Sequence, residues 1–171
     1  MKKLLLTFTL IGALLVGCTK IMNTPTKKVE ELMSKYQKVD DDIKNEINAL
    51  LNDEVNLTEE ERKEYYDIIT NQYKKLTYVI KDETVDKDKA VVTTEIEVID
   101  YKKEIDNVDS RYSSDATLDK NNYNKDKISA LKNAKEKVKY TLEINVTKDK
   151  DGNWSVDSLT SNDRKKIQGM Y

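Results

Sequence analysis

Residues 138–147 read Val138-Lys139-Tyr140-Thr141-Leu142-Glu143-Ile144-Asn145-Val146-Thr147. Apolar and polar side chains alternate along this stretch, which is typical of a β-strand with one buried and one solvent-facing side. Residues 90–99 alternate in the same way, with Ala90, Val92, Thr94, Ile96 and Val98 on one side and Thr93, Glu95 and Glu97 on the other. Two strands of one half-covered sheet are therefore predicted.

Short polar connections link these strands to two others. Asp86-Lys87-Asp88-Lys89 lies between residues 76–85 and residues 90–99, which indicates a hairpin. Asp151-Gly152 is a turn pair that leads from residues 138–147 into a predicted fourth strand, residues 153–159. The sequence thus predicts an antiparallel sheet of about four strands.

Three helices are predicted before the first strand. Thr24-Pro25 is a cap followed by proline at the first helical position, Asp40-Asp41-Asp42 puts negative charge at a second helix start, and Thr58 with Glu61 has capping-box spacing. The apolar residues that repeat with helical period are Val29, Leu32, Met33 and Tyr36 in the first helix, Ile43, Ile47, Leu50 and Leu51 in the second, and Tyr65, Ile68, Ile69, Tyr73 and Leu76 in the third.

Further helical segments are predicted between the second and third strands and near residue 169. Residues 101–112 show helical spacing, residues 113–122 are a polar loop, and residues 123–131 add one or two more turns. A short helix over residues 162–167 ends at Gly169, because glycine tolerates the positive φ of a helix stop. The predicted fold class is α+β, with N-terminal helices packed on a curved antiparallel sheet and a helical insertion between strands two and three.

The first eighteen residues carry a leader pattern. Lys2 and Lys3 precede an apolar run, and Leu15-Val16-Gly17-Cys18 resembles the lipobox of bacterial lipoproteins. A transmembrane anchor would need about 20 predominantly apolar residues, whereas the run from Leu4 to Val16 has 13. We therefore expect a signal peptide over residues 1–17, a lipidated cysteine and short tether over residues 18–24, and a single α+β domain over residues 25–171.

Composition excludes several classes of function. The net charge is −2, and removal of Lys2 and Lys3 with the leader makes it −4, so no basic field favours nucleic acid. The chain has no histidine, which excludes Ser-His-Asp catalysis and His-ligated zinc. It has four glycines, too few and too scattered for a phosphate-binding loop.

The remaining polar clusters favour structural interpretations. Asp149, Asp151 and Asn153 suggest a calcium loop, but the glycine falls at the fourth position instead of the sixth, which favours a solvated hairpin tip. Glu95 and Glu97 could form a carboxylate pair for acid–base work, but their alternation with apolar residues places them toward solvent. No catalytic, cofactor-binding or metal-binding residue is assigned, and no cofactor is expected.

The aromatic residues are predicted to pack in or beside the core. Most of the ten tyrosines lie in periodic apolar stripes, as Tyr36, Tyr73 and Tyr140 do, although tyrosines can also line a ligand pocket. Trp154 follows the Asp151-Gly152 turn, so its ring is expected to seal the sheet against the helices.

Several segments of the mature chain are similar to a group of Gram-positive lipoproteins that carry a small α+β domain. They are Thr24 to Glu30, Tyr73 to Tyr78, Asp86 to Val98, Val138 to Leu142, Gly152-Asn153-Trp154 and Asp163 to Tyr171. The resemblance implies a cone fold of the nuclear-transport-factor-2-like (NTF2-like) or cystatin-like type. The acid and histidine pocket of its enzymatic members is missing here, so the resemblance brings no catalytic residue.

We expect a non-enzymatic extracytoplasmic domain, held at the cell membrane by diacylglycerol and palmitate-type chains on Cys18. It would bind an envelope protein, peptide or other envelope component through the concave sheet face or the 113–122 loop. The alternative is an NTF2-like small-molecule pocket, with weak hydrolase or isomerase activity at a buried tyrosine or carboxylate. A structural role in envelope or spore assembly also remains open, as does the oligomeric state.

Overall fold

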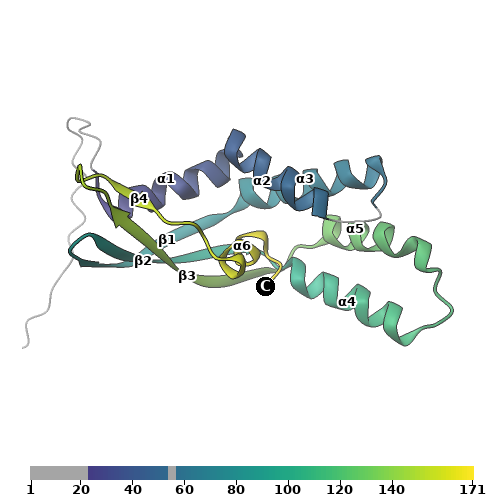
Figure 1. Cartoon of the computed structure of the whole chain (residues 1–171). Coiled ribbons are helices and arrows are strands. Elements are labelled where there is room, and N and C mark those ends of the chain that lie inside the picture. The colour runs from purple at the N-terminus through teal and green to yellow at the C-terminus, as the bar shows by residue number, and fades with distance from the viewer. Residues whose placement is uncertain (1–22, 54–56) are drawn as a thin grey trace, which may run out of the picture.

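The computed structural model describes residues 23–53 and 57–171, and in this part of the chain the α+β class is confirmed (Figure 1). Its elements, in chain order, are α1 (Pro25–Lys38), α2 (Asp41–Asp53), α3 (Glu59–Lys75), β1 (Thr77–Asp86), β2 (Lys89–Ile99), α4 (Tyr101–Ser114), the 3-10 helix η1 (Lys120–Asn122), α5 (Tyr123–Asn133), β3 (Lys137–Lys148), β4 (Trp154–Val156) and α6 (Ser161–Gln168).

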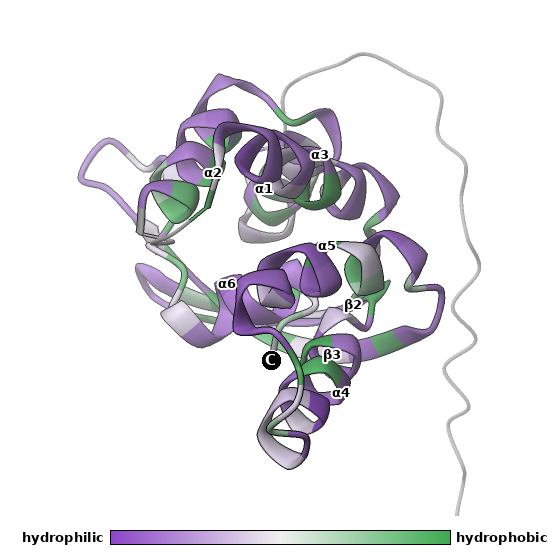
Figure 2. Cartoon of the chain, turned by 90° about the vertical axis from the view of Figure 1, so that its right-hand side faces the viewer, coloured by the Kyte–Doolittle hydropathy of each residue, from purple (hydrophilic) through white to green (hydrophobic). Residues whose placement is uncertain are grey.

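The sheet is antiparallel, with the strand order β1-β2-β3-β4. β2 pairs with β3 along its whole length, from Lys89 opposite Thr147 to Ile99 opposite Lys137. The alternation predicted for β2 is confirmed, because every second residue from Ala90 to Val98 is buried. Figure 2 shows α1, α2 and α3 on one side of the strands, so this helix layer covers the buried face.

The helix starts follow the predicted caps. The Thr24 side chain accepts a hydrogen bond from Lys27 N, with Pro25 at the first helical position, and Thr58 forms a reciprocal capping box with Glu61. From α1, Val29, Met33 and Tyr36 fill the core above the sheet. The helix-covered sheet face is therefore filled by side chains and is not a free binding surface.

Two strand predictions needed correction. The fourth strand was expected over residues 153–159, but β4 ends at Val156, after which the chain turns toward Thr160, the cap of α6. β1 contains a bulge between Ile80 and Asp82, where Lys81 is the extra residue. A bulge shifts the alternation by one residue. Glu83 consequently turns to the helix side and accepts a hydrogen bond of 2.8 Å from Thr26 N, in the first turn of α1.

The insertion between β2 and β3 is a pair of helices, α4 and α5, as the sequence predicted. We call this pair, with its connecting loop, the arm. The arm begins where Asp100 N donates a hydrogen bond of 2.8 Å to Glu136 O. Ile128 and Leu131 of α5 are buried in the core cluster. Figure 1 shows the arm at one end of the molecule, with the N-terminal end of α1 at the other.

A buried glutamine joins three elements at the root of the arm. The Gln72 side chain of α3 is 0% exposed. Its Nε2 donates to Ile99 O (2.8 Å) at the end of β2 and to Gln168 O (3.1 Å) in α6, while its Oε1 accepts from Ile99 N (3.1 Å). Every one of these groups is a strong donor or acceptor that would be costly to bury alone.

Gly169 permits this junction to close. It has the predicted positive φ of a helix stop, 71°. A Cβ atom there would lie 2.0 Å from Ile99 O and 2.4 Å from Gln72 Nε2, so a larger residue cannot fit without a backbone shift. Gly169 O also accepts a hydrogen bond of 2.8 Å from Lys102 N, in the first turn of α4.

We expect Gln72→Ala to lower the free energy of unfolding by about 3 kcal/mol, because it leaves Ile99 N, Ile99 O and Gln168 O without their partner. The neighbouring exposed substitution Asn71→Ala is the control and should change stability by less than about 0.5 kcal/mol. Chemical denaturation measures both. Equal stabilities of the two variants would contradict a structural role for the carboxamide.

Candidate functional site

The residues predicted to carry the lipid anchor, Cys18 with Leu15, Val16 and Gly17, lie outside the described residues. Lipidation thus stays a prediction. The first described residue is Asn23, five positions after Cys18 in the sequence. Its surroundings are the candidate site where the domain would join the tether predicted over residues 18–24.

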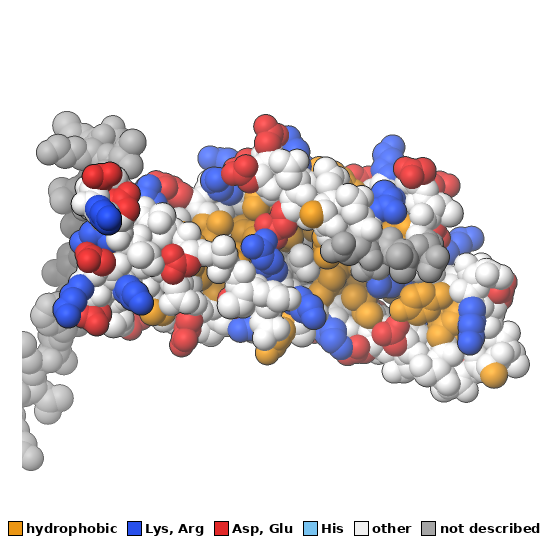
Figure 3. All heavy atoms as spheres, in the orientation of Figure 1, with side chains coloured by type: hydrophobic (Ala, Val, Ile, Leu, Met, Phe, Trp, Pro, Cys, Tyr) orange, Lys and Arg blue, Asp and Glu red, His pale blue; other side chains and the backbone are white. Residues whose placement is uncertain are grey.

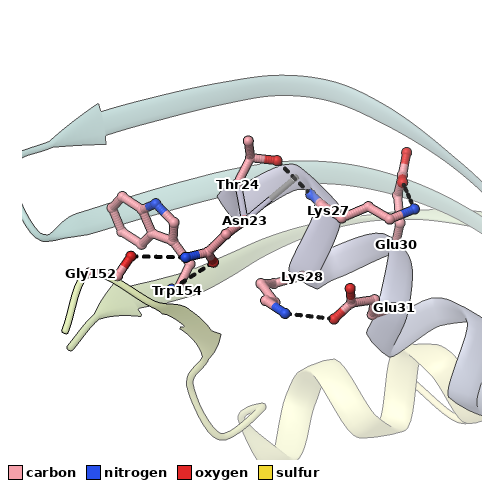
Figure 4. Close-up of polar contacts among 8 residues, drawn as sticks. All are labelled: Asn23, Thr24, Lys27, Lys28, Glu30, Glu31, Gly152 and Trp154. Carbon is pink, nitrogen blue, oxygen red and sulfur yellow. Dashed lines mark hydrogen bonds and ion pairs between the residues drawn. The ribbon is translucent and has the colours of Figure 1, made fainter. Parts of the chain in front are cut away.

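Asn23 binds the hairpin between β3 and β4 (Figure 4). Its Nδ2 donates to Gly152 O (2.9 Å), and its Oδ1 accepts from Trp154 N (3.0 Å). One carboxamide thereby pairs with two backbone groups of the hairpin, as a neighbouring strand would. We call these two contacts the Asn23 clamp. They fix Asn23, the first described residue, against the hairpin.

The residues around the clamp are also paired. Lys27 forms an ion pair with Glu30 (3.1 Å), and Lys28 forms one with Glu31 (2.9 Å), both along α1 (Figure 4). The buried Trp154 ring lies beneath Lys148, whose Nζ is 4.6 Å from the ring centroid. The ring is thus buried on the last hairpin, and β4 contacts α1, in agreement with its predicted sealing position.

The Asp149 carboxylate belongs to the hairpin turn. It accepts hydrogen bonds from Asp151 N (2.9 Å) and Asn153 N (2.8 Å), and Asn153 Nδ2 lies 3.3 Å from its second oxygen. The hydrogen bond from Asn153 N is the main reason that the pKa of Asp149 is lowered. Within residues 23–53 and 57–171, no group of three or more acidic or cysteine side chains could hold a metal ion.

Glu95 and Glu97 lie on the open face of the sheet, opposite the helix layer. Glu95 pairs with Lys139 (3.1 Å) and Lys81 (3.4 Å), and Glu97 pairs with Lys137 (2.7 Å). Hydrogen bonds from Lys139 and Lys137 lower the pKa of Glu95 and Glu97, respectively. Both carboxylates are therefore held ionised, which suits cross-strand pairing and does not suit proton donation.

Tyr36 and Tyr73 pack in the core as predicted. Their ring centroids are 5.0 Å apart at an edge-to-face angle of 76°. The Tyr36 hydroxyl lies 3.3 Å from both oxygens of Glu46, which also pairs with Arg164 of α6 (3.0 Å). Burial raises the pKa of Tyr36, and the negative charge of Glu46 raises it further. These tyrosines hold α1, α2, α3 and α6 together.

Two tyrosines close the outer end of the arm. Tyr112 of α4 donates to Asp126 of α5 (3.0 Å), and Tyr123 of α5 donates to Asp109 of α4 (2.5 Å). Their rings meet edge to face at 5.3 Å. Arg111 adds an ion pair of 2.9 Å to Asp126. A groove of about 350 Å³ runs between the two helices, with Val108 and Ala130 in its lining.

The surface carries mixed charge. Figure 3 shows Lys, Arg, Asp and Glu side chains interspersed over the face in view, without an extended region of one sign. Among the described residues, no helix is long and apolar enough to cross a membrane.

No protein-family model and no curated protein matches the chain. Among solved structures, the chain is similar to the Bacillus subtilis protein ycdA, which carries a provisional description as a lipoprotein. The two sequences are 16% identical, the match covers 82% of this chain and 46% of ycdA, and the TM-score is 0.41. The chain thus spans about half the length of that protein. The NTF2-like or cystatin-like cone inferred from the sequence is not identified by these comparisons.

We expect a fall in stability as the pH rises from 10 toward 12. Burial raises the pKa of Tyr101 to about 12 from its ordinary 10.0, so its contribution is complete below pH 10 and is lost as the pH approaches 12. Tyr101→Phe should reduce this fall by about 2 kcal/mol. Unfolding curves at each pH measure it, with Tyr171→Phe at a half-exposed ring as the control. Parallel curves for both variants would contradict the assignment.

Proposed function

We propose that this chain is a lipid-anchored extracytoplasmic domain that is not an enzyme and that presents the arm to a protein, peptide or other component of the cell envelope. The observation that carries the proposal is the position of the Asn23 clamp. The clamp joins Asn23 to the β3–β4 hairpin, at the end of the sheet opposite the arm (Figure 1), and the proposed tether comes directly before Asn23 in the sequence.

The proposed anchor is close to the folded domain. Five residue steps separate Cys18 from Asn23, and a fully extended chain of that length spans roughly 17 Å. Two or three acyl chains on Cys18 would hold the protein firmly, because each buried methylene contributes about 0.8 kcal/mol. The arm would then extend along the membrane surface or away from the membrane, and it would lie farther from the anchor than the tether spans.

The arm is favoured over the sheet face that the helices cover, because that face is filled. Val29, Met33 and Tyr36 occupy the space above the sheet. The predicted loop, residues 113–122, contains the last two residues of α4 and the helix η1, and most of its residues are exposed. Loops on a rigid support commonly carry binding residues, and the tyrosine contacts at the end of the arm provide such a support.

The small-molecule alternative has less support. The core tyrosines that would line a pocket are in contact with each other and with Glu46. The groove between α4 and α5 is bordered by the ion pair of Arg111 with Asp126. A buried apolar pocket with a few convergent polar groups is the usual form of a small-molecule site.

The anchor is tested on the native protein. We expect mass spectrometry to find diacylglycerol on Cys18 at a new N-terminus, and we expect Cys18→Ser to abolish this modification and release the protein from the membrane fraction. Thr19→Ser is the matched control and should leave both unchanged. An unmodified Cys18 in membrane-associated protein would overturn the anchor.

The binding surface is tested by photo-crosslinking in intact membranes. A photoreactive residue in place of Ala116, in the arm loop, should capture a reproducible partner, because this position is exposed and lies far from the tether. The same residue in place of Ser155, which is exposed on β4, is the control. Equal capture at both positions, or none at Ala116, would argue against the arm as the contact surface.

A further inference from the structure

The edge of the sheet formed by β1 is exposed. In the described sheet β1 is paired only with β2. Of the three large hydrophobic side chains that are exposed in residues 23–53 and 57–171, two lie on this strand: Val79 (53%) and Val85 (49%). An edge strand carries unpaired N–H and C=O groups along its length, so it can accept another strand.

A groove of about 560 Å³ lies along α1 and meets the β1 edge at Tyr78. Its lining includes Glu30, Glu31, Ser34, Gln37 and Lys38 of α1 and Tyr78 of β1. A strand added next to β1 would direct every second side chain to the helix side of the sheet. A side chain that lies opposite Tyr78 would enter the groove.

The bulge at Lys81 restricts which strand can pair here. Ile80 lies opposite Thr94 and Asp82 opposite Thr93, so the alternation shifts by one at Lys81. Tyr78 and Ile80 before the bulge, and Glu83 and Val85 after it, all belong to the helix side. An ordinary strand without a bulge cannot match both halves, whereas a second copy of β1 carries the same shift.

We propose that two copies of this chain pair through β1 in antiparallel fashion and form a continuous eight-stranded sheet. In this pairing, residues on the helix side of the sheet lie opposite residues on the helix side, and residues on the open face lie opposite residues on the open face. The opposed residues are Thr77 with Asp86, Tyr78 with Val85, Val79 with Thr84, Ile80 with Glu83, and Lys81 with Asp82, and each pair occurs twice around the two-fold axis.

Charge and burial select this register. Lys81 of each copy faces Asp82 of the second copy, so the centre of the interface holds two opposite-charge pairs. Shifting the register by two residues in one direction places Asp82 opposite Glu83, and shifting it in the other places Val79 opposite Asp82. In the proposed register Val85 of each copy enters the groove beside Tyr78 of the second copy, and Val79 lies against Thr84.

The proposal does not rest on the lipid anchor. If both copies are anchored, the two Asn23 clamps lie at opposite ends of the paired sheet. Both short tethers can reach one bilayer when the strands run along its surface, and the two arms then point in opposite directions.

The first experiment exchanges the central charges in the full chain, extracted from whole cells in detergent and studied by sedimentation equilibrium. Lys81→Asp and Asp82→Lys should each raise the dissociation constant of the dimer roughly tenfold, because each replaces two attractive pairs by two repulsive ones. The double exchange should restore dimerisation. The Lys81 contact with Glu95 of its own chain is lost in both Lys81→Asp and the double exchange, so a merely structural effect would not be rescued.

The second experiment is disulfide cross-linking between co-expressed full chains, one with Val79→Cys and the other with Thr84→Cys. Cross-linked dimer should form at least tenfold more than with Val79→Cys and Thr141→Cys, an exposed position on the open face of β3. A chain with Cys18 alone controls for the native thiol. A monomeric native protein, or no excess over the control, would overturn the proposal. Capture of a different protein at position 79 would overturn it too, in favour of an extended segment of that protein.

Discussion

The buried carboxamide of Gln72 is the contact on which the rest of the structure depends. It uses both its donor and its acceptor, and its three partners belong to the end of β2 and to α6. Because a buried polar group without a partner is costly, α3, β2 and α6 must be in place together. Gly169 allows the backbones to come close enough for this. The same junction determines where the arm begins, since α4 follows β2 at Tyr101 and Lys102 N donates to Gly169 O.

At the other end of the sheet, the side-chain amide of Asn23 also joins two distant segments of the chain. Asn23 pairs with Gly152 and Trp154, and thereby joins the start of α1 to the β3–β4 hairpin. The two amides lie near opposite ends of the sheet, with a filled core between them, and the arm begins beside Gln72. Among the described residues, the arm, the open face of the sheet and the β1 edge are available for contact. The ion pairs of Glu95 and Glu97 cover part of the open face.

Local patterns in the sequence predicted the elements but not the contacts between distant segments. Alternation in residues 138–147 and 90–99 predicted the central strands, and Thr58 with Glu61 predicted a helix start. The bulge at Lys81 was missed because residues 76–85 read as an uninterrupted strand. Asn23 was missed because its partners lie about 130 positions away. Gln72 did carry a signal, since it lies on the same helical stripe as Ile68 and Ile69, where a polar residue needs a buried partner.

The central claim, that Gln72 holds the end of β2 in the core, is tested most directly by native-state hydrogen exchange of the Ile99 amide. This amide donates to Gln72 Oε1 although it lies at the last residue of the strand. We expect it to exchange as slowly as the amides at the centre of β2, through global unfolding alone. Fast exchange at Ile99, with the centre of β2 still protected, would show that the strand end frays and would contradict the claim.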